Sequence, residues 1–419
     1  MSTRRTFLKI AGAASFAAPS LASAQGAGRV VVVGGGFGGA TAARTLKQLD
    51  SKLTVTLVEP NPVYTACPFS NSVLANLREI SQQQFRYDAI KATGVTVAET
   101  SATAVDAQAR TVTLADGTKL SYDRLVLSPG IDFDWGAIPG YDEAASQKIP
   151  HAWKAGAQTT LLRQQLQDMR DGGLVVISAP ANPYRCPPGP YERASLIAYW
   201  MSIWKPKSKL LLLDSKDTFS KQRLFQDGWN QLYPGTIEWV PLSKGGKVTS
   251  VDPATLTLVT EFGSHKADVA NVIPPQKAGA IAAKAGVADR TGWCPVEPVA
   301  FESTLQRGIH VLGDAAIMGA MPKAAFAANA QAKVCAAAIV ELLAGRTPQP
   351  PLLINTCYSL LAADYGISIA GVYRPDNGQL TEVPGAGGVS AISAVGGLRG
   401  QEALYAASWF RTITAETFG

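Results

Sequence analysis

The sequence predicts an α/β fold, with two units in which strands and helices alternate and a smaller C-terminal α+β unit. A Gly-rich turn near residue 34 joins a run of valines to a helical stretch, and a second aliphatic strand pattern opens a similar unit near residue 174. Strand signals return after residue 348. At 419 residues the chain is also longer than one hydrophobic core usually supports.

Composition and charge narrow the class of protein. Hydrophobic residues make up 47% of the chain and charged residues 17%, which is typical of a globular protein and not of a disordered one. The formal net charge is +6, but no Lys/Arg-rich run is interleaved with aromatic residues. We therefore expect no nucleic-acid partner.

The first residues are predicted to be an export signal. The charged stretch Arg4–Lys9 contains an arginine pair, a modest apolar run then reaches Ala18, and Ala22–Ala24 forms a small-residue cleavage site. Residues 1–24 therefore have the pattern of a twin-arginine signal peptide, and we expect a periplasmic protein. Beyond this segment we find no apolar run long enough for a transmembrane helix, so no membrane insertion is predicted.

The first unit carries a dinucleotide-binding pattern. Residues 29–33 are predicted to form a buried strand, residues 40–49 a helix and residues 53–58 a second strand that ends in Glu59. A Gly-x-Gly-x-x-Gly turn separates the first strand from the helix, about twenty residues before the acid, as a dinucleotide fingerprint requires. Glu59 is placed to bind the adenosine ribose hydroxyls.

Each residue of that turn has a predicted place. Gly34 permits the tight turn, Gly36 lets the backbone approach a pyrophosphate, and Gly39 lets the helix pack closely on the strand. Phe37 and Gly38 lie at the helix N-terminus, which would face the phosphate charge.

Two later strands end in turns whose residues we expect to bind the same cofactor. Pro129 and Gly130 follow one strand, and Gly313 and Asp314 follow the other. Flavoproteins with two dinucleotide-type units often have an aspartate at the latter position, on the ribityl chain and pyrophosphate. A plain helix N-cap is the alternative for Asp314. Together with the glycine turn, this aspartate favours FAD over NAD at the first site.

The second unit lacks a phosphate-binding turn. Its strands are predicted at residues 174–177 and 209–214, but the turn after the first strand, residues 178–188, is rich in proline. Proline has no N–H with which to hold a phosphate. We therefore expect no NAD(P)H at this unit, so electrons would leave by another route.

The five cysteines allow several interpretations. There is no Cys-x-x-Cys and no Cys-x-x-Cys-His, so neither a zinc ribbon nor a c-type haem attachment site is present, and no metal site is predicted. Export permits disulfides, and an odd count leaves at least one cysteine outside any intramolecular pair. On spacing alone, Cys67, Cys186 and Cys357 could each be a small buried residue or part of a structural disulfide, and a role at the cofactor is the alternative.

The chain resembles the flavoprotein subunit of flavocytochrome c sulfide dehydrogenase, a relative of the sulfide:quinone oxidoreductases, over nearly its whole mature length. The resemblance rests on the arginine-pair leader, the glycine turn, the Gly-Asp pair at 313–314 and three further stretches, Tyr64–Asn71, Tyr184–Arg193 and Asn271–Gln276. The stretch Tyr184–Arg193 is the most specific. The implied fold is glutathione reductase-like, with two Rossmann-like dinucleotide-binding-type domains.

The resemblance implies roles for four residues. Cys67 would carry FAD covalently through an 8α-S-cysteinyl bond, and Cys186 and Cys357 would form a redox-active disulfide beside the flavin. Glu192 would lie close to that disulfide and accept a proton or balance charge. A surface acid is the alternative for Glu192, and both interpretations stay open.

The implied activity is the oxidation of sulfide to sulfur or polysulfide. HS⁻ would attack one sulfur of the disulfide to give a persulfide and a thiolate, and two electrons would then pass to the flavin. The resemblance implies that the acceptor is a c-type cytochrome, as a separate haem subunit; this sequence has no haem motif of its own. Two alternatives stay open: a sulfide:quinone oxidoreductase, and a flavin electron-transfer subunit that oxidises nothing itself.

The resemblance and the strand pattern together suggest domain boundaries. We expect the FAD-binding domain at residues 28–150 and 276–347, the second Rossmann-like domain at 151–275 and a C-terminal interface domain at 348–419. Gly385–Gly400 is predicted to be a loop, and the weak apolar stripe after Glu402 is expected to pack on the core rather than to anchor a membrane. Cys294 and Cys335 receive no role beyond packing.

Overall fold

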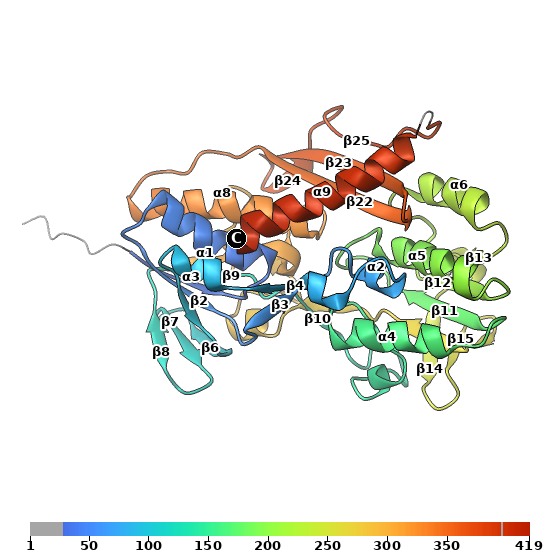
Figure 1. Cartoon of the computed structure of the whole chain (residues 1–419). Helices are drawn as coiled ribbons and strands as arrows, with labels where there is room; N and C mark the ends of the chain where they lie inside the picture. Colours follow the sequence, from blue (N-terminus) through green and yellow to red (C-terminus); the bar gives the residue numbers. More distant parts are fainter. Residues whose placement is uncertain (1–27, 395–396) are drawn as a thin grey trace, which may run out of the picture.

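The computed structural model describes residues 28–394 and 397–419. The predicted signal peptide at residues 1–24 lies outside the described residues and stays a prediction. The described chain contains two parallel sheets, each covered by helices, and a third, antiparallel sheet near the C-terminus (Figure 1). The predicted α/β fold class is confirmed.

The first sheet is parallel and has the strand order β20-β9-β1-β2-β5. Its strands are β1 (Arg29–Val33), β2 (Thr54–Val58), β5 (Thr96–Ala98), β9 (Arg124–Leu127) and β20 (Ile309–Val311). The valines of β1 are buried, as expected for the middle of a sheet that is covered on both faces. Because β20 comes from a distant part of the chain, two separate segments build this sheet.

Helices and small strands surround the first sheet. Helix α1 (Phe37–Leu49) packs on β1 and β2, and α8 (Ala325–Leu343) packs along α1 (Figure 1). The smaller elements are β3 (Val63–Thr65), α2 (Ser70–Leu74), β4 (Gln84–Arg86), α3 (Asp88–Ala92), β6 (Ala102–Asp106), β7 (Thr111–Leu114), β8 (Lys119–Ser121), β10 (Ile131–Phe133), β18 (Gln276–Ala278), α7 (Ile281–Lys284), β19 (Cys294–Pro295) and β21 (Ala316–Ile317).

The second sheet is parallel and has the order β13-β12-β11-β17. Its strands are β11 (Leu174–Ala179), β12 (Lys209–Asp214), β13 (Ile237–Val240) and β17 (Val269–Val272), and its helices are α4 (Ala157–Asp168), α5 (Gly189–Trp204) and α6 (Gln222–Leu232). An antiparallel sheet of β14 (Val248–Asp252), β15 (Thr257–Thr260) and β16 (Ser264–Lys266) accompanies it. Strand β11 runs two residues beyond its predicted end, which shortens the proline-rich loop before α5.

The third sheet consists of β22 (Leu353–Ala362), β23 (Tyr365–Asp376), β24 (Gln379–Glu382) and β25 (Gly388–Val389). Helix α9 (Leu398–Phe418) lies along β22 and β23, and its end reaches α1 (Figure 1). The predicted loop Gly385–Gly400 therefore contains the short strand β25 and the first residues of α9. The predicted domain boundaries are not tested by these elements and stay predictions.

The structure bears on two expectations about apolar segments, and one of them is corrected. By length and composition α8 could cross a membrane, so the expectation that no such run exists is wrong; half of its apolar window is buried, as in a core helix. It packs between α1 and β22. Helix α9 does pack on the core through Ala406 and Phe410, but Leu404 and Tyr405 are 66% and 50% exposed because they lie on its outer face.

Candidate functional site

The glycine turn between β1 and α1 forms one wall of a cavity of about 480 Å³. Gly34 has φ +101°, and a Cβ atom there would lie 2.3 Å from the backbone oxygen of Ser128. A Cβ atom on Gly39 would lie 1.8 Å from the backbone oxygen of Gly34. At these two positions a side chain would collide with backbone, so the sharp turn and the close approach of α1 both require glycine.

Glu59 is fixed at the end of β2 beside this turn. Its Oε2 accepts a hydrogen bond from the backbone N–H of Gly35 at 2.8 Å, and its Oε1 accepts from the backbone and side-chain N–H groups of Asn61 at 3.0 and 2.8 Å. Tyr87 donates to the Gly35 carbonyl at 3.0 Å, which adds a second side-chain contact to the turn. Carboxylate oxygens accept several hydrogen bonds, so Glu59 can also accept from ribose hydroxyls.

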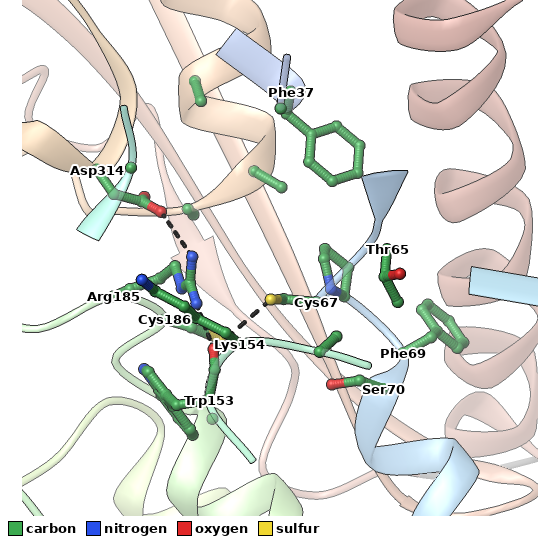
Figure 2. Close-up of a pocket in the computed structure, with 18 of the residues that line it drawn as sticks. Phe37, Thr65, Cys67, Phe69, Ser70, Trp153, Lys154, Arg185, Cys186 and Asp314 are labelled. Atoms are coloured by element: carbon green, nitrogen blue, oxygen red, sulfur yellow. Dashed lines mark hydrogen bonds and ion pairs between the residues drawn. The ribbon is translucent and has the colours of Figure 1, made fainter. Parts of the chain in front are cut away.

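Asp314 follows β20 and faces the same cavity. Its Oδ2 lies 3.7 Å from an Arg185 nitrogen (Figure 2), whereas its Oδ1 is buried without a hydrogen-bond partner among the described residues. Burial raises the pKa of Asp314, and Arg185 opposes that shift. Asp314 is not the N-cap of α8, because Ala324 occupies that position, so the helix-cap alternative is wrong.

An orphaned buried acceptor costs about 1–3 kcal/mol, and a ligand that donates to it recovers this energy. The hydroxyl-rich ribityl chain of FAD has suitable donors. Pro129 and Gly130, which follow β9, line the cavity beside Gly313. The residues present therefore fit a dinucleotide with a polyol chain.

Cys67 lies in the loop between β3 and α2 and lines the same cavity. Its thiol donates to the backbone carbonyl of Trp153 at 3.6 Å (Figure 2). The Arg185 guanidinium donates to that same carbonyl oxygen. Trp153, Arg185 and Cys67 come from three separate segments, so this junction joins the first and second units at the cavity.

Cys186 and Cys357 reach the cavity from two further elements. Cys186 lies in the proline-rich loop with φ +58°, a left-handed conformation that is uncommon for residues other than glycine. Its backbone N–H donates to the Lys323 carbonyl at 2.8 Å. Cys357 lies on β22, where the Asn355 side chain donates to its Sγ at 3.5 Å. Burial raises the pKa of both thiols.

The five cysteines of the chain are all free thiols in the structure. The Cys186–Cys357 disulfide therefore stays a prediction, although both residues line one cavity. Cys294 and Cys335 are fully buried in the core, where they were expected to pack. The described residues contain no group of three or more His, Cys, Asp or Glu side chains that could hold a metal ion.

Glu192 lies in the first turn of α5 and connects three elements. Its Oε1 accepts from the backbone N–H of Leu360 on β22 at 2.9 Å, and its Oε2 accepts from Asn71 on α2 at 2.9 Å. Burial raises the pKa of this carboxyl group, and the two hydrogen bonds oppose the shift. Glu192 is part of the cavity wall beside Cys186 and Cys357, so it is not a free surface acid.

The adjacent residue, Arg193, was missed by the sequence reasoning. It is 2% exposed, and its guanidinium donates to four acceptors within 3.0 Å: the Asn71 and Asn271 side chains and the carbonyls of His151 and Ala152. Burial lowers its pKa to about 10, so it stays charged at neutral pH. An arginine at the start of a helix whose remaining residues are mostly apolar was the signal that could have identified it.

In the second unit, the carboxylate at the end of β12 is buried and hydrogen-bonded by protein groups. Asp214 is fully buried, and its carboxylate accepts from the Tyr191 hydroxyl at 2.6 Å, the Trp239 indole at 3.0 Å and the Lys216 ammonium at 2.6 Å. In an NAD-binding unit, an acid at this position binds ribose hydroxyls. Here protein donors take that place, and the expected absence of an NAD(P)H site stays a prediction.

Comparisons with known proteins identify the family of this chain. Residues 159–274 match the family model described as sulfide dehydrogenase [flavocytochrome c] flavoprotein chain, central, and residues 349–418 match flavocytochrome c sulphide dehydrogenase, flavin-binding. A flavoprotein chain of sulfide dehydrogenase [flavocytochrome c] from Chlorobaculum thiosulfatiphilum is 60% identical over 48 residues, which is 12% of this chain and the whole of that sequence. The chain belongs to the flavocytochrome c sulfide dehydrogenase flavoprotein family.

More distant relatives share the architecture of this family. Residues 28–177 match the pyridine nucleotide-disulphide oxidoreductase model. Mouse mitochondrial sulfide:quinone oxidoreductase is 22% identical over 307 residues, covering 68% of this chain and 65% of that protein. The sulfide:quinone oxidoreductase of Aquifex aeolicus has a TM-score of 0.71 at 17% identity over 93% of this chain and 92% of that one, and putidaredoxin reductase in its putidaredoxin complex has 0.66 at 18% over 93% of each.

These structural similarities show the fold, and the family matches show the cofactor class. The predicted fold with two dinucleotide-type domains is confirmed by the pyridine nucleotide-disulphide oxidoreductase match. As a member of the flavocytochrome c sulfide dehydrogenase flavoprotein family, the chain is a flavin-dependent oxidoreductase that uses FAD.

Proposed function

We propose that this chain oxidises sulfide to sulfur or polysulfide through a Cys186–Cys357 disulfide, and that it passes electrons through FAD to a c-type cytochrome subunit in the periplasm. One observation carries the proposal. Cys186, Cys357 and Glu192 come from separate elements, yet they line one cavity together with the glycine turn. The family matches support the same substrate.

Atoms and electrons balance when sulfide is oxidised by these groups. HS⁻ forms an S–S bond to one cysteine, the Cys186–Cys357 bond breaks, and its electron pair stays on the other cysteine as a thiolate. Re-forming the disulfide releases neutral sulfur and a proton and leaves two electrons. FAD, when bound, supplies the acceptor for this electron pair. Glu192 lines the same cavity as both cysteines and takes the proton in this proposal, since burial raises its pKa and so favours its protonated form.

The test is anaerobic mixing of the purified FAD-containing protein with sulfide. The flavin's visible absorbance should bleach without NAD(P)H, and added c-type cytochrome should then restore it. A flavin that sulfide leaves oxidised would reject sulfide oxidation and favour a passive electron-transfer subunit. A haem stain of material co-purified from the periplasm tests the proposed partner and location; recovery without a haem protein would count against them.

Sulfide:quinone oxidoreductase is the second candidate. The exposed side chains of Leu404 and Tyr405 on α9 favour it, because an enzyme that reduces membrane quinone needs an apolar surface near the bilayer. The two candidates differ in the acceptor. Soluble quinone that reoxidises the sulfide-reduced flavin faster than c-type cytochrome does would support the second one.

Cys67 is proposed as the covalent attachment point of FAD. It lines the same cavity as the glycine-turn residues Phe37 and Gly38, and its Sγ donates to the Trp153 carbonyl. Acid-denatured wild-type protein should stay yellow after washing, whereas the Cys67→Ser variant should release its flavin into the supernatant. Free FAD in the wild-type supernatant would contradict the attachment.

A further inference from the structure

Lys221 is a buried cation that the proposed chemistry does not yet use. It is the residue before α6, with φ +61° and a side chain that is 8% exposed. Its Nζ donates to the Ser359 hydroxyl at 2.8 Å, and this is its single hydrogen-bond partner among the described residues. An ammonium so deeply buried usually has a negatively charged partner.

Strand β22 places Ser359, the hydrogen-bond partner of this ammonium, on the same face as Cys357. Side chains two residues apart on a strand share a face and lie about 7 Å apart. Asn355, Cys357 and Ser359 therefore point the same way, and both Asn355 and Ser359 are at most 2% exposed. The Asn355 amide donates to the Cys357 sulfur, and Lys221 holds Ser359 on the other side. Cys357 thus lies on this strand face between Asn355, which donates to its sulfur, and Ser359, which accepts from the ammonium.

The other charged groups that face Lys221 are less suitable partners. Glu402 on α9 is already paired with Arg399 at 2.8 Å. Glu192 on α5 has both oxygens hydrogen-bonded to other groups, and burial raises its pKa. Cys186 faces Lys221 too. Glu192 opposes a negative charge on both sulfurs, but its effect exceeds that of Lys221 at Cys186, whereas the effect of Lys221 is the larger at Cys357. A negative charge on Cys357 would appear only when the disulfide opens, and it would not already be paired with another group.

We propose that Lys221 is a positioning residue whose ammonium holds negative charge on the Cys357 sulfur when the disulfide opens. The inference rests on the proposed function. A better-stabilised thiolate is the better leaving group, so HS⁻ would form its bond to Cys186 while the electron pair of the broken bond stays on Cys357. A fixed cation in a buried site stabilises such a charge far more than it would in water.

The test measures the Cys357 thiol itself. In a reduced Cys186→Ser background, the rate at which iodoacetamide alkylates Cys357 is followed against pH, and the modified peptide is identified by mass spectrometry. Replacing Lys221 by methionine should shift this profile upward by at least about one pH unit, so that alkylation slows about tenfold near neutral pH. Lys221→Arg, which keeps the charge, should stay close to the parent profile.

Controls separate charge from structure. Ser359→Ala removes the hydrogen bond of Lys221 but keeps its ammonium, so its shift should be much smaller than that of Lys221→Met. If the methionine variant does not fold, Lys221→Gln supplies the same neutral test. An unchanged alkylation profile in the folded neutral variant overturns the inference.

The alkylation assay needs no sulfide, so its outcome is independent of the proposed function. Wild-type flavin that sulfide fails to reduce would reject the proposed function, even if the neutral Lys221 variant shifts the thiol profile. Normal sulfide oxidation together with an unshifted profile would reject the role of Lys221 alone.

Discussion

Replacing either Cys186 or Cys357 with serine is expected to lower the rate of sulfide-dependent flavin reduction by at least about a thousandfold. A serine hydroxyl cannot form a disulfide or a persulfide, so neither variant has an S–S bond for HS⁻ to open. The two residues act as one unit, and the double variant should lose no more activity than either single variant. Stopped-flow measurement of flavin bleaching by sulfide gives the rates directly.

The matched control is Cys335→Ala, which removes a fully buried thiol in α8 outside the cavity. It should reduce its flavin at nearly the wild-type rate. Flavin absorbance of each variant before mixing verifies that the FAD site is intact. Serine variants that keep the full rate would show that sulfide reduces the flavin without these thiols.

Local sequence patterns predicted the first unit well because its signals are short-range. The glycine turn, the valines of β1 and the acid after β2 lie within about thirty residues, and one βαβ unit uses them all. Strand ends were less accurate: β11 continues to Ala179, because burial extends pairing into residues that look like a turn. The expectation that no apolar run is long enough for a membrane span failed at α8, whose length and alanine-rich composition satisfy that criterion although half of its window is buried.

The cavity could not be assembled from local patterns. Cys67, Cys186 and Cys357 line one cavity because three units converge there, and the proposed pairing of Cys186 with Cys357 required the family resemblance. Lys221 gives no signal in the sequence, since a lysine before a helix usually faces solvent. Its burial depends on the position of β22, whose residues contact Lys221 from far along the sequence. Arg193 differs, because an arginine among apolar helix residues already indicates a buried hydrogen-bonding role.

The buried hydrogen-bonding role of Arg193 predicts the second large effect, a loss of stability. Replacing Arg193 with methionine should lower the free energy of unfolding by about 3 kcal/mol or more, because several buried acceptors lose their donor at once. Among them are the Asn71 side chain and the His151 carbonyl, which belong to different segments of the cavity wall. The urea midpoint, followed by far-UV circular dichroism, measures the change. Lysine should not restore stability, because one ammonium cannot reproduce the guanidinium fork.

Arg86→Met provides the control for this prediction. Arg86 forms an ion pair with Asp88 at 3.1 Å, but its side chain is 68% exposed, so its loss should change the free energy of unfolding by less than about 1 kcal/mol. Equal urea midpoints for the two variants would mean that the Arg193 hydrogen bonds contribute no more than a surface pair. A large difference would instead show that one buried cation joins α5 and α2 to the segment before α4, and so holds the cavity wall together.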